Sequence, residues 1–549
     1  MATAAAAYEA GRFDEAERIC VAVLDRDPDE FDAMRLLGLL QHRAGRRTAA
    51  LASYDRALAL RPDHAETLNN RGNVLTDLKH LAEALASYDK ALRIEPQFAE
   101  AHYNRGLLLK GLKRREEALA SLDAALAIRP NYAQALNTRG ATLYELDRHE
   151  EALASYDKAL AIRPAFAEAF NNRGVALYRM RQFDEALANY DRAIAVRPAY
   201  AEAFNNRGVV LKELRRIEEA LASYGKAQQL APDYADVHWN EALLRLLIGD
   251  FAAGLAKYEW RWRRQSFTSP LRNFPQPQWG GTEPLEGKTI LLHGEQGFGD
   301  AIQFCRYVPQ VKARGARVIL EVAEPLCGLM GSLGAAQIVA AGSRLPPFDL
   351  HCPLVSLPLA FGTRPGTIPA AVPYLAPPAD AAPAWETRLG PRKRPRIGFA
   401  WAGNPRQEND RNRSASLTAL LPLLAIDATF VSLQKDLRAG DDALLKARAD
   451  IVNLGGTLAD FSDAAGLVSR MDVVVSVDTS IAHLAGALGK PVFVLLCFTP
   501  DWRWLMAGDT NAWYPTARLF RQPRPQDWDE PVAQVAAKFK DRLGLETVR

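Results

Sequence analysis

The chain has 549 residues, more than one hydrophobic core usually holds, so we expect several compact units. With 48% hydrophobic and 24% charged residues, its composition is that of a folded protein and excludes wholesale disorder. The formal net charge of +3 gives no reason to expect a nucleic-acid or membrane partner, because such surfaces attract concentrated positive charge.

Targeting signals and cysteine spacings are the next features to test. Residues 1–13 contain no basic leader and no long apolar segment, so no secretory signal is expected. The apolar stretch 473–498 is interrupted by Asp478, His483 and Lys490, which predicts protein core instead of a membrane span. The five cysteines show no metal or redox spacing, which favours reduced thiols. A cytoplasmic protein is therefore expected.

The first half of the chain repeats itself with a period of 34 residues. Three residue types keep this spacing in phase: Pro28, Pro62, Pro96, Pro130, Pro164, Pro198 and Pro232; Gly38, Gly72, Gly106, Gly140, Gly174 and Gly208; Ala16, Ala50, Ala84, Ala118, Ala152, Ala186 and Ala220. Over about residues 1–264 this pattern resembles the tetratricopeptide repeat. Each unit is then two antiparallel helices, and stacked units form an α-solenoid with a concave groove.

The recurring small and aromatic residues explain how such units pack. We expect Gly and Ala where helix backbones approach closely, and Pro just after the second helix, because Pro cannot donate a helical hydrogen bond. A recurring tyrosine is expected to fill the space between stacked units: Tyr54, Tyr88, Tyr156, Tyr190, Tyr224 and Tyr258.

Asparagines recur in two neighbouring registers of the first helix, although Asn is a poor helix former. The candidates for a peptide groove are Asn70, Asn104, Asn172, Asn206 and Asn240. Two interpretations stay open. One is repeat duplication with hydrogen bonds between adjacent helices. The other is an amide ladder that binds an extended polypeptide, similar to that of the protein O-GlcNAc transferases.

The array is predicted to end at residues 258–264, an aromatic and basic segment that either caps the solenoid against the next domain or binds an anion. Residues 265–287, rich in Pro and Gly, are predicted to be a linker. Strand and helix patterns then alternate, which predicts parallel sheets. Strands are expected near 289–293, 317–322, 396–401, 429–433 and 472–477. We expect one Rossmann-like half over 288–390 and another over 391–549, the GT-B plan, with an amphipathic helix near 531–543 packed across both halves.

Three segments of this second half together resemble glycosyltransferase family 9, the heptosyltransferases, over roughly residues 288–545. They are the Gly297–Asp300 turn after the first strand, the arginine-bearing loop 403–414, and the segment 477–487. Repeat-bearing bacterial members are the most similar, and they share the stretches 501–504 and 513–515. The resemblance implies an inverting, metal-independent enzyme that uses a nucleotide-diphosphate sugar and needs no further cofactor.

The resemblance also implies site residues. Asp300 matches the catalytic base for the acceptor hydroxyl; its other interpretation is a helix N-cap. On the donor side stand Asp478, Thr479, Ser480, Ile481, His483, Arg413 and Gly299. The Asp478 carboxylate is implied to contact the sugar, and the following helix N-terminus to hold the diphosphate. His483 is either a phosphate-side residue or a packing histidine. Arg413 stands where classical members carry a lysine; it keeps the positive charge, but a guanidinium differs in geometry from an ammonium group. Lys435 is a weaker candidate.

Two functions of different classes follow from the sequence. The first is a glycosyltransferase whose repeats recruit the acceptor, with a protein as the expected class. The second is a scaffold protein whose sheet domains have lost turnover. A third, a lipopolysaccharide-core transferase, is disfavoured by the repeats.

Overall fold

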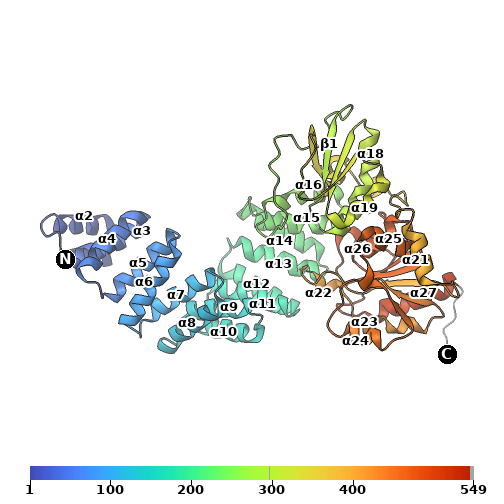
Figure 1. The fold of residues 1–549 in the computed structure, drawn as a ribbon. Coiled ribbons are helices and arrows are strands. Elements are labelled where there is room, and N and C mark those ends of the chain that lie inside the picture. Colours follow the sequence, from blue (N-terminus) through green and yellow to red (C-terminus); the bar gives the residue numbers. More distant parts are fainter. Residues whose placement is uncertain (296, 408, 544–549) are drawn as a thin grey trace. The chain divides into compact units, whose positions relative to one another are not determined.

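The computed structural model describes residues 1–295, 297–407 and 409–543. Gln296 of the predicted glycine-rich turn and Glu408 of the arginine-bearing loop lie outside the described residues. The chain divides into two compact units, residues 1–214 and 215–549 (Figure 1).

The first unit is an array of antiparallel helix pairs. Its helices are α1 (Ala2–Glu9), α2 (Phe13–Leu24), α3 (Phe31–Arg43), α4 (Arg47–Leu60), α5 (Ala65–Asp77), α6 (Leu81–Ile94), α7 (Ala99–Gly111), α8 (Arg115–Ile128), α9 (Ala133–Glu145), α10 (His149–Ile162), α11 (Ala167–Arg179), α12 (Phe183–Val196) and α13 (Ala201–Glu213). From α4 onward each second helix ends two residues before a proline of the 34-residue period, as predicted.

A tyrosine ring of the same hairpin faces Gly38, Gly72, Gly140 and Gly174, whereas Leu122 faces Gly106. A Cβ atom added at Gly140 would lie 2.5 Å from Tyr156 Cε1, and one at Gly174 would lie 2.7 Å from Tyr190 Cε1. The tyrosine therefore fills the space between the two helices of its own unit. It also packs on the next unit, as predicted, since Tyr88 shares a buried cluster with Leu108 and Tyr156 shares one with Ala176. The ring reaches the first helix because that helix has no side chain at this position.

The second unit begins with α14 (Ile217–Leu230), α15 (Ala235–Leu247), α16 (Phe251–Tyr258) and the 3-10 helix η1 (Glu259–Arg263). These last helices are part of the core of the α/β region. Leu246, Phe251 and Tyr258 belong to the same buried cluster as Ile290, of the first sheet, and Trp502. This shared core explains why the division between the units falls at residue 214 and not at the end of the repeats.

The first sheet is parallel with strand order β3-β2-β1-β4. Its strands are β1 (Thr289–His293), β2 (Arg317–Val322), β3 (Gln337–Ala340) and β4 (Leu350–Pro353). The helical elements of this half are α17 (Phe298–Phe304), η2 (Cys305–Tyr307), α18 (Val308–Ala313), η3 (Glu324–Leu326), α19 (Cys327–Met330), η4 (Gly331–Leu333), η5 (Leu354–Ser356), α20 (Leu357–Ala360) and η6 (Pro365–Thr367). The next helix, α21 (Ala381–Leu389), packs instead on the second half, where the Trp385 indole donates to Asp463.

The two faces of the first sheet are covered differently. Ile290 and Leu292 point into the shared core, whereas Leu291 between them points to a smaller cluster with Ile319 and Phe274. Phe274 belongs to the segment predicted as a linker. This segment therefore packs on the sheet in addition to connecting the repeats to it.

The second sheet is also parallel, with strand order β10-β9-β8-β5-β6-β7. Its strands are β5 (Arg396–Ala400), β6 (Thr429–Ser432), β7 (Ile451–Asn453), β8 (Val473–Val477), β9 (Val492–Leu496) and β10 (Ala517–Arg521). The helical elements are α22 (Asp410–Arg413), α23 (Leu417–Leu420), η7 (Leu421–Ala425), α24 (Asp441–Lys446), η8 (Gly455–Thr457), α25 (Phe461–Ser469), α26 (Ser480–Ala487), η9 (Trp502–Trp504) and α27 (Asp529–Leu543). This strand order is that of the doubly wound dinucleotide-binding fold, in which ligands bind where the order reverses, here between β5 and β8.

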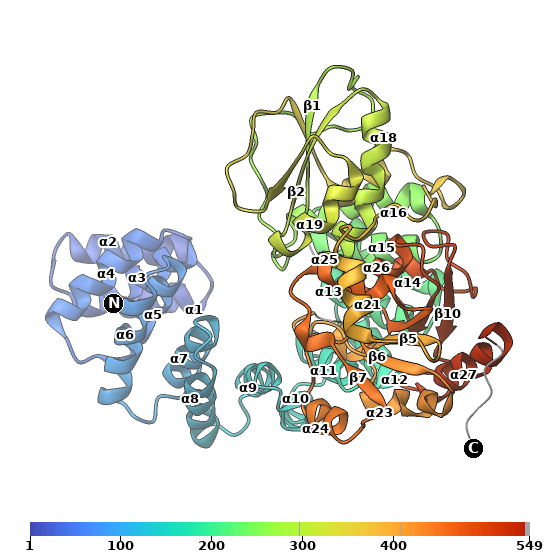
Figure 2. The same ribbon diagram turned by 45° about the vertical axis from the view of Figure 1, so that its right-hand side comes forward.

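The C-terminal helix α27 packs differently from the prediction. Its described apolar residues Val532, Val535 and Phe539 join a cluster that contains Phe493 and Phe520 of the second sheet. Figure 2 shows α27 beside β10. Its main contacts among the described residues are with η7, α23, β9 and β10, all in the second half.

Candidate functional site

Two helix N-termini, one after each sheet's central strand, lie against each other. Helix α17 follows β1 and α26 follows β8. A Cβ atom added at Gly299 would lie 2.9 Å from His483 Cδ2 and 3.7 Å from the Ser480 Cα. The absence of a side chain at Gly299 is what allows this approach. The structure thus brings together the two turns that the sequence singled out 180 residues apart.

Asp300 is the third residue of α17, so it is not the N-cap, a position held by Gly297. Its carboxylate accepts a hydrogen bond from the Arg503 guanidinium. Burial raises the pKa of the Asp300 carboxyl, and the Arg503 charge opposes that rise. The carboxyl is therefore positioned by a cation from the other half of the α/β region.

Asp478 lies at the carboxyl end of β8, with its side chain 14% exposed. Burial and the neighbouring Asp501 carboxylate raise the pKa of Asp478 to about 6, against the lowering effect of Arg413. A carboxylate with a raised pKa at the end of a sheet strand is typical of a functional site.

Arg413 reaches the same turn from the loop after β5. It donates a hydrogen bond of 3.0 Å to the Asp478 carbonyl oxygen. A Cβ atom added at Gly403 would lie 2.4 Å from the Arg413 guanidinium, so the glycine leaves room for it. Lys435, in contrast, is exposed and donates to the Ala459 carbonyl oxygen at 3.2 Å, as expected of a surface lysine.

The turn before α26 has the geometry of a helix start. Thr479 is the N-cap residue in extended conformation, and its hydroxyl lies 3.1 Å from that of Ser476. The Ala482 and His483 amides bond back to the Thr479 carbonyl oxygen. The Ser480 and Ile481 amides precede these bonds, and both residues are partly exposed. Such amides, with the helix dipole, favour an anion.

His483 lies one turn into α26 and is 5% exposed. Its Nδ1 atom is 3.0 Å from the Tyr514 hydroxyl, and its Nε2 atom is 3.8 Å from Asp478 Oδ1. The ring stacks on Trp504 with centroids 5.3 Å apart. His483 is thus both a packed residue and a neighbour of the carboxylate.

The cluster also contains Arg503, Asp501 and Gln303, none of which was predicted as a site residue. Arg503 donates to Asp501 at 2.8 Å and to Gln303 at 2.7 Å, besides its bond to Asp300. The stretch 501–504 was noted as shared with similar proteins, and that was the available signal. Its partner Asp300 is about two hundred residues away, so no spacing rule could pair them.

Segment 258–264 was expected either to cap the repeats against the next domain or to bind an anion, and its contacts are those of a cap. Arg261 is fully buried and binds Glu295 with two hydrogen bonds of 2.7 and 2.8 Å. It also donates to Glu259 at 2.6 Å and to Ser356 at 2.8 Å. These carboxylates satisfy the guanidinium, so this end of the repeats ties the helices to the first sheet.

The asparagine registers make hydrogen bonds between adjacent helices, as their first interpretation expects. Asn104 donates to Asn69 at 2.9 Å, and Asn206 donates to Asn171 at 3.0 Å. The same bond joins Asn172 to Asn137 at 3.1 Å. The groove candidates Asn70, Asn104, Asn172, Asn206 and Asn240 are all partly exposed. An exposed amide can bond a neighbour and a ligand together, so these bonds leave the peptide interpretation open.

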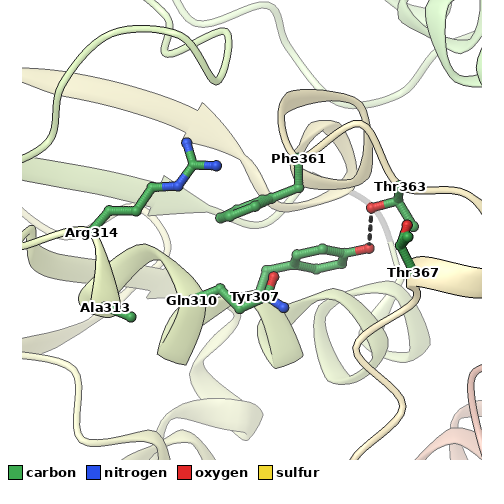
Figure 3. A pocket seen from close by; sticks show the side chains of 7 residues that line it. All are labelled: Tyr307, Gln310, Ala313, Arg314, Phe361, Thr363 and Thr367. Carbon is green, nitrogen blue, oxygen red and sulfur yellow. Dashed lines mark hydrogen bonds between the residues drawn. The ribbon is translucent and has the colours of Figure 1, made fainter.

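A hollow of about 330 Å³ lies elsewhere in the first half of the α/β region. Figure 3 shows Tyr307 and Phe361 stacked in it, with Arg314 beside Phe361 and the Tyr307 hydroxyl 2.8 Å from that of Thr363. None of the residues that line it belongs to the predicted site.

Comparisons with family models agree with both halves of the chain. Models of the tetratricopeptide repeat match residues 1–65, 72–113, 99–132, 140–180, 167–200 and 201–234. The model of glycosyltransferase family 9 (heptosyltransferase) matches residues 434–521. The matched range contains Asp478 to His483 and Arg503, whereas Asp300 and Arg413 lie outside it.

Similar proteins were found for parts of the chain. Protein FlbA of Caulobacter vibrioides is 24% identical over 331 residues, which are 55% of this chain and 54% of FlbA. The chain thus spans about half the length of that relative. YrrB, described as a TPR protein with an unusual peptide-binding site, is 27% identical over 35% of this chain and 98% of YrrB, with a TM-score of 0.30. Pseudomonas aeruginosa pilF is 21% identical over 40% of this chain and 99% of its own, with a TM-score of 0.36.

Within the described part of the chain, no helix combines the length and the apolar character that crossing a bilayer demands. The repeat models and the family 9 model cover separate parts of the sequence, in the order that the fold shows. The chain therefore joins tetratricopeptide repeats to a glycosyltransferase family 9 region.

Proposed function

We propose that this protein is a metal-independent inverting glycosyltransferase that moves a sugar from a nucleotide-diphosphate donor to an acceptor recruited by the repeats. The observation that carries the proposal is the meeting of α17, with Asp300, and α26, with the Asp478 turn, at the carboxyl ends of two parallel sheets. Ligands of open parallel sheets bind at such ends.

In this proposal the donor occupies the N-terminus of α26. Inverting transfer leaves a nucleoside diphosphate, so the site needs donors that are in place before negative charge develops. The amides of Ser480 and Ile481 and the Arg413 guanidinium supply them. Asp478 contacts the sugar. Gly299 allows the close approach of the two helices, which brings Asp300 near the Asp478 turn.

Asp300 is the proposed base. Removal of the acceptor's proton requires a carboxylate on the face opposite the leaving group. Asp300 lies on the half that faces the donor half, and burial raises its pKa, which strengthens a base. The acceptor class that the repeats favour is a polypeptide, because such arrays bind extended segments in their concave face.

A scaffold protein without turnover is the second candidate, and one observation favours it. Arg503 holds the Asp300 carboxylate in an ion pair that also includes Asp501. A base held in this way is weaker and must exchange partners before it accepts a proton. The scaffold candidate needs no such exchange.

Calorimetric titration of the full chain with ADP, UDP, GDP and dTDP, and with their sugar conjugates, tests the proposal. We expect saturable binding of one nucleotide, reduced at least tenfold in Arg413→Ala, whereas Asp478→Asn should weaken its sugar conjugate more than the free nucleotide. Lys435→Ala is the matched control and should bind like the wild type, since Lys435 bonds only a surface carbonyl. Absence of binding to every nucleotide would favour the scaffold.

The base is tested with the donor that binds. Asp300→Ala should bind that donor as the wild type does and release no nucleoside diphosphate from it when acceptor is present in a cell extract. A fully active Asp300→Ala variant would reject the base assignment while leaving the donor site in place.

A further inference from the structure

The Asp410 carboxylate lies between two arginines and is hydrogen-bonded to only one of them. It accepts hydrogen bonds from the Arg438 guanidinium and, at 2.9 Å, from the Ser414 hydroxyl. Arg413 is farther away, because 3.7 Å separates its Nε atom from Asp410 Oδ1 and no hydrogen bond joins them. Asp410 is 5% exposed, so these side chains, and not bulk water, decide what it binds.

The Arg413 guanidinium is largely buried and has most of its donors free. Its side chain is 15% exposed. Among the described residues it makes a single hydrogen bond, from Nη1 to the Asp478 carbonyl oxygen at 3.0 Å, and its buried Nε atom has no partner. An arginine has five N–H donors, and a buried donor without an acceptor is unfavourable. Arg413 is thus fixed at the Asp478 turn with donors left for an acceptor-rich ligand.

Arg438 is held in place by the segments on either side of it. Its guanidinium also donates to the Gly403 carbonyl oxygen at 2.8 Å, and its backbone N–H donates to Asp441 at 2.9 Å. Asp441 is 7% exposed and also accepts from the Trp401 indole at 2.8 Å. These bonds fix Arg438 between Gly403, where the arginine-bearing loop begins, and Asp410.

The charges of these groups show what Arg438 does. Two guanidinium groups lie around one carboxylate, so Arg413, Arg438 and Asp410 together carry one net positive charge. Without Arg438, a movement of about 1 Å would bring the Asp410 carboxylate into hydrogen-bond range of Arg413 Nε. We propose that Arg438 is a positioning residue: it holds the Asp410 carboxylate away from Arg413 and so keeps the Arg413 guanidinium available for an anion.

The place of Arg413 indicates which anion this is. Its hydrogen bond to the Asp478 carbonyl oxygen puts the guanidinium beside the N-terminus of α26, where free amides also favour negative charge. For a nucleotide-diphosphate donor the anion is the diphosphate. This identification rests on the proposed function, whereas the competition of two arginines for Asp410 does not.

NMR of the arginine side chains tests the competition without a ligand. The Nε–H signal of Arg413 in the nitrogen-15-labelled full chain is assigned by its loss in Arg413→Lys. In Arg438→Met the Asp410 carboxylate should turn to Arg413, so the Nε proton should shift downfield, as protons in charge-assisted hydrogen bonds do. In the double variant Arg438→Met, Asp410→Asn the signal should return close to its wild-type position. An unchanged signal in Arg438→Met would overturn the proposal.

A second variant keeps the test decisive if Arg438→Met does not fold. Asp410→Asn alone should leave the Arg413 Nε–H signal where it is in the wild type, because Asp410 does not accept from that group. An upfield shift in Asp410→Asn would show that Asp410 already binds Arg413, and would refute the role of Arg438.

Binding of the nucleotide found by calorimetry gives a separate readout. Arg438→Met should weaken the nucleoside diphosphate about fivefold, because Arg413 is then paired with Asp410, and the added Asp410→Asn should restore most of the affinity. Loss of the loop's shape would not be rescued by a second substitution, so failure of the rescue would count against Asp410 as the competitor. Arg448→Met, which breaks a surface pair with Asp450, is the matched control and should bind like the wild type. If no nucleotide binds, the proposed function fails, while the NMR result still decides whether Arg438 withholds Asp410 from Arg413.

Discussion

The glycines of the repeats allow a sharp test of packing, with Gly140→Ala as the perturbation. The added Cβ atom would lie 2.5 Å from Tyr156 Cε1 and 2.8 Å from its Cδ1. Tyr156 is 1% exposed, so its ring has no free space to move into. Overpacking of this kind costs about 1–3 kcal/mol, whereas the helix propensity of Ala returns about 0.5–1 kcal/mol. We therefore expect a net loss of about 1–2 kcal/mol.

The matched control is Gly225→Ala, in the interior of α14. No atom lies within 4 Å of a Cβ atom there, so only the propensity term remains. This variant should stabilise its helix by about 0.5–1 kcal/mol. The two substitutions are chemically identical and differ only in what the new methyl group meets.

Amide hydrogen exchange measured by mass spectrometry reads both changes locally, in the full chain. Because repeats contact mainly their neighbours, the effect of Gly140→Ala should be confined to peptides of α9, α10 and the adjoining hairpins. A loss of 1–2 kcal/mol means exchange that is about 5–30 times faster. Slower or unchanged exchange over 133–162 would show that the glycine is not required by the Tyr156 ring.

Three further predictions follow from buried or strained groups. Arg261→Met leaves Glu295, whose side chain is 1% exposed, without its cation, and should destabilise the second unit by about 3–5 kcal/mol in calorimetric unfolding; an unchanged midpoint would contradict this. Burial lowers the pKa of His293 to about 3 and that of His351 below its usual value. The unfolded chain therefore binds more protons than the folded chain between about pH 3 and 6.5, and the free energy of unfolding should fall as the pH drops through that range. His293→Leu should make the urea midpoint depend less on pH. Lys113 has a φ of 61°, at a turn position where other repeats carry Gly11, Gly45 and Gly249. A β-branched side chain fits this left-handed conformation poorly, so Lys113→Val should speed local hydrogen exchange about tenfold. Lys113→Gly should not speed it.

The repeats were readily predicted because their information is local. Each helix boundary follows from a proline or a turn that recurs every 34 residues, and α4 to α14 end where that period requires. The contact of Gly140 with Tyr156 was harder to assign. The period places both residues, but it does not say whether the ring faces its own hairpin or the next.

The α/β region was predicted in part. Strands β1, β2, β5, β6 and β8 were expected because each is a run of apolar residues bounded by turns. Strands β3, β4 and β7 have only three or four residues and, unlike the equally short β6, were not expected; β9 lies in the same apolar stretch as β8. β10 includes two arginines, which hide its apolar face.

The candidate site shows the same division between local and distant information. Asp300 and Asp478 were expected because the short motifs around them resemble glycosyltransferase family 9, and their place after predicted strands agreed with that resemblance. The Arg503–Asp300 pair and the contact between His483 and Tyr514 join segments that are not adjacent in sequence. Such pairs depend on how the two sheets meet, and composition or spacing contains no measure of that.

The position of Trp502 connects the last repeat to the candidate site. On one side its ring meets Phe251 at 5.8 Å and Tyr258 at 6.1 Å, both from the repeat helices. The next residue, Arg503, holds Asp300 on the other side. A displacement of the last repeat must therefore move Trp502. The adjacent residue, Arg503, is the cation that holds the proposed base, Asp300. These contacts couple the last repeat to the candidate site only if the loop with Trp502 and Arg503 has a second conformation, and if both the repeat and the site change its population. The exchange of Arg503 from Asp300 to a bound diphosphate would be such an arrangement, because the proposed reaction needs Asp300 released when the donor arrives.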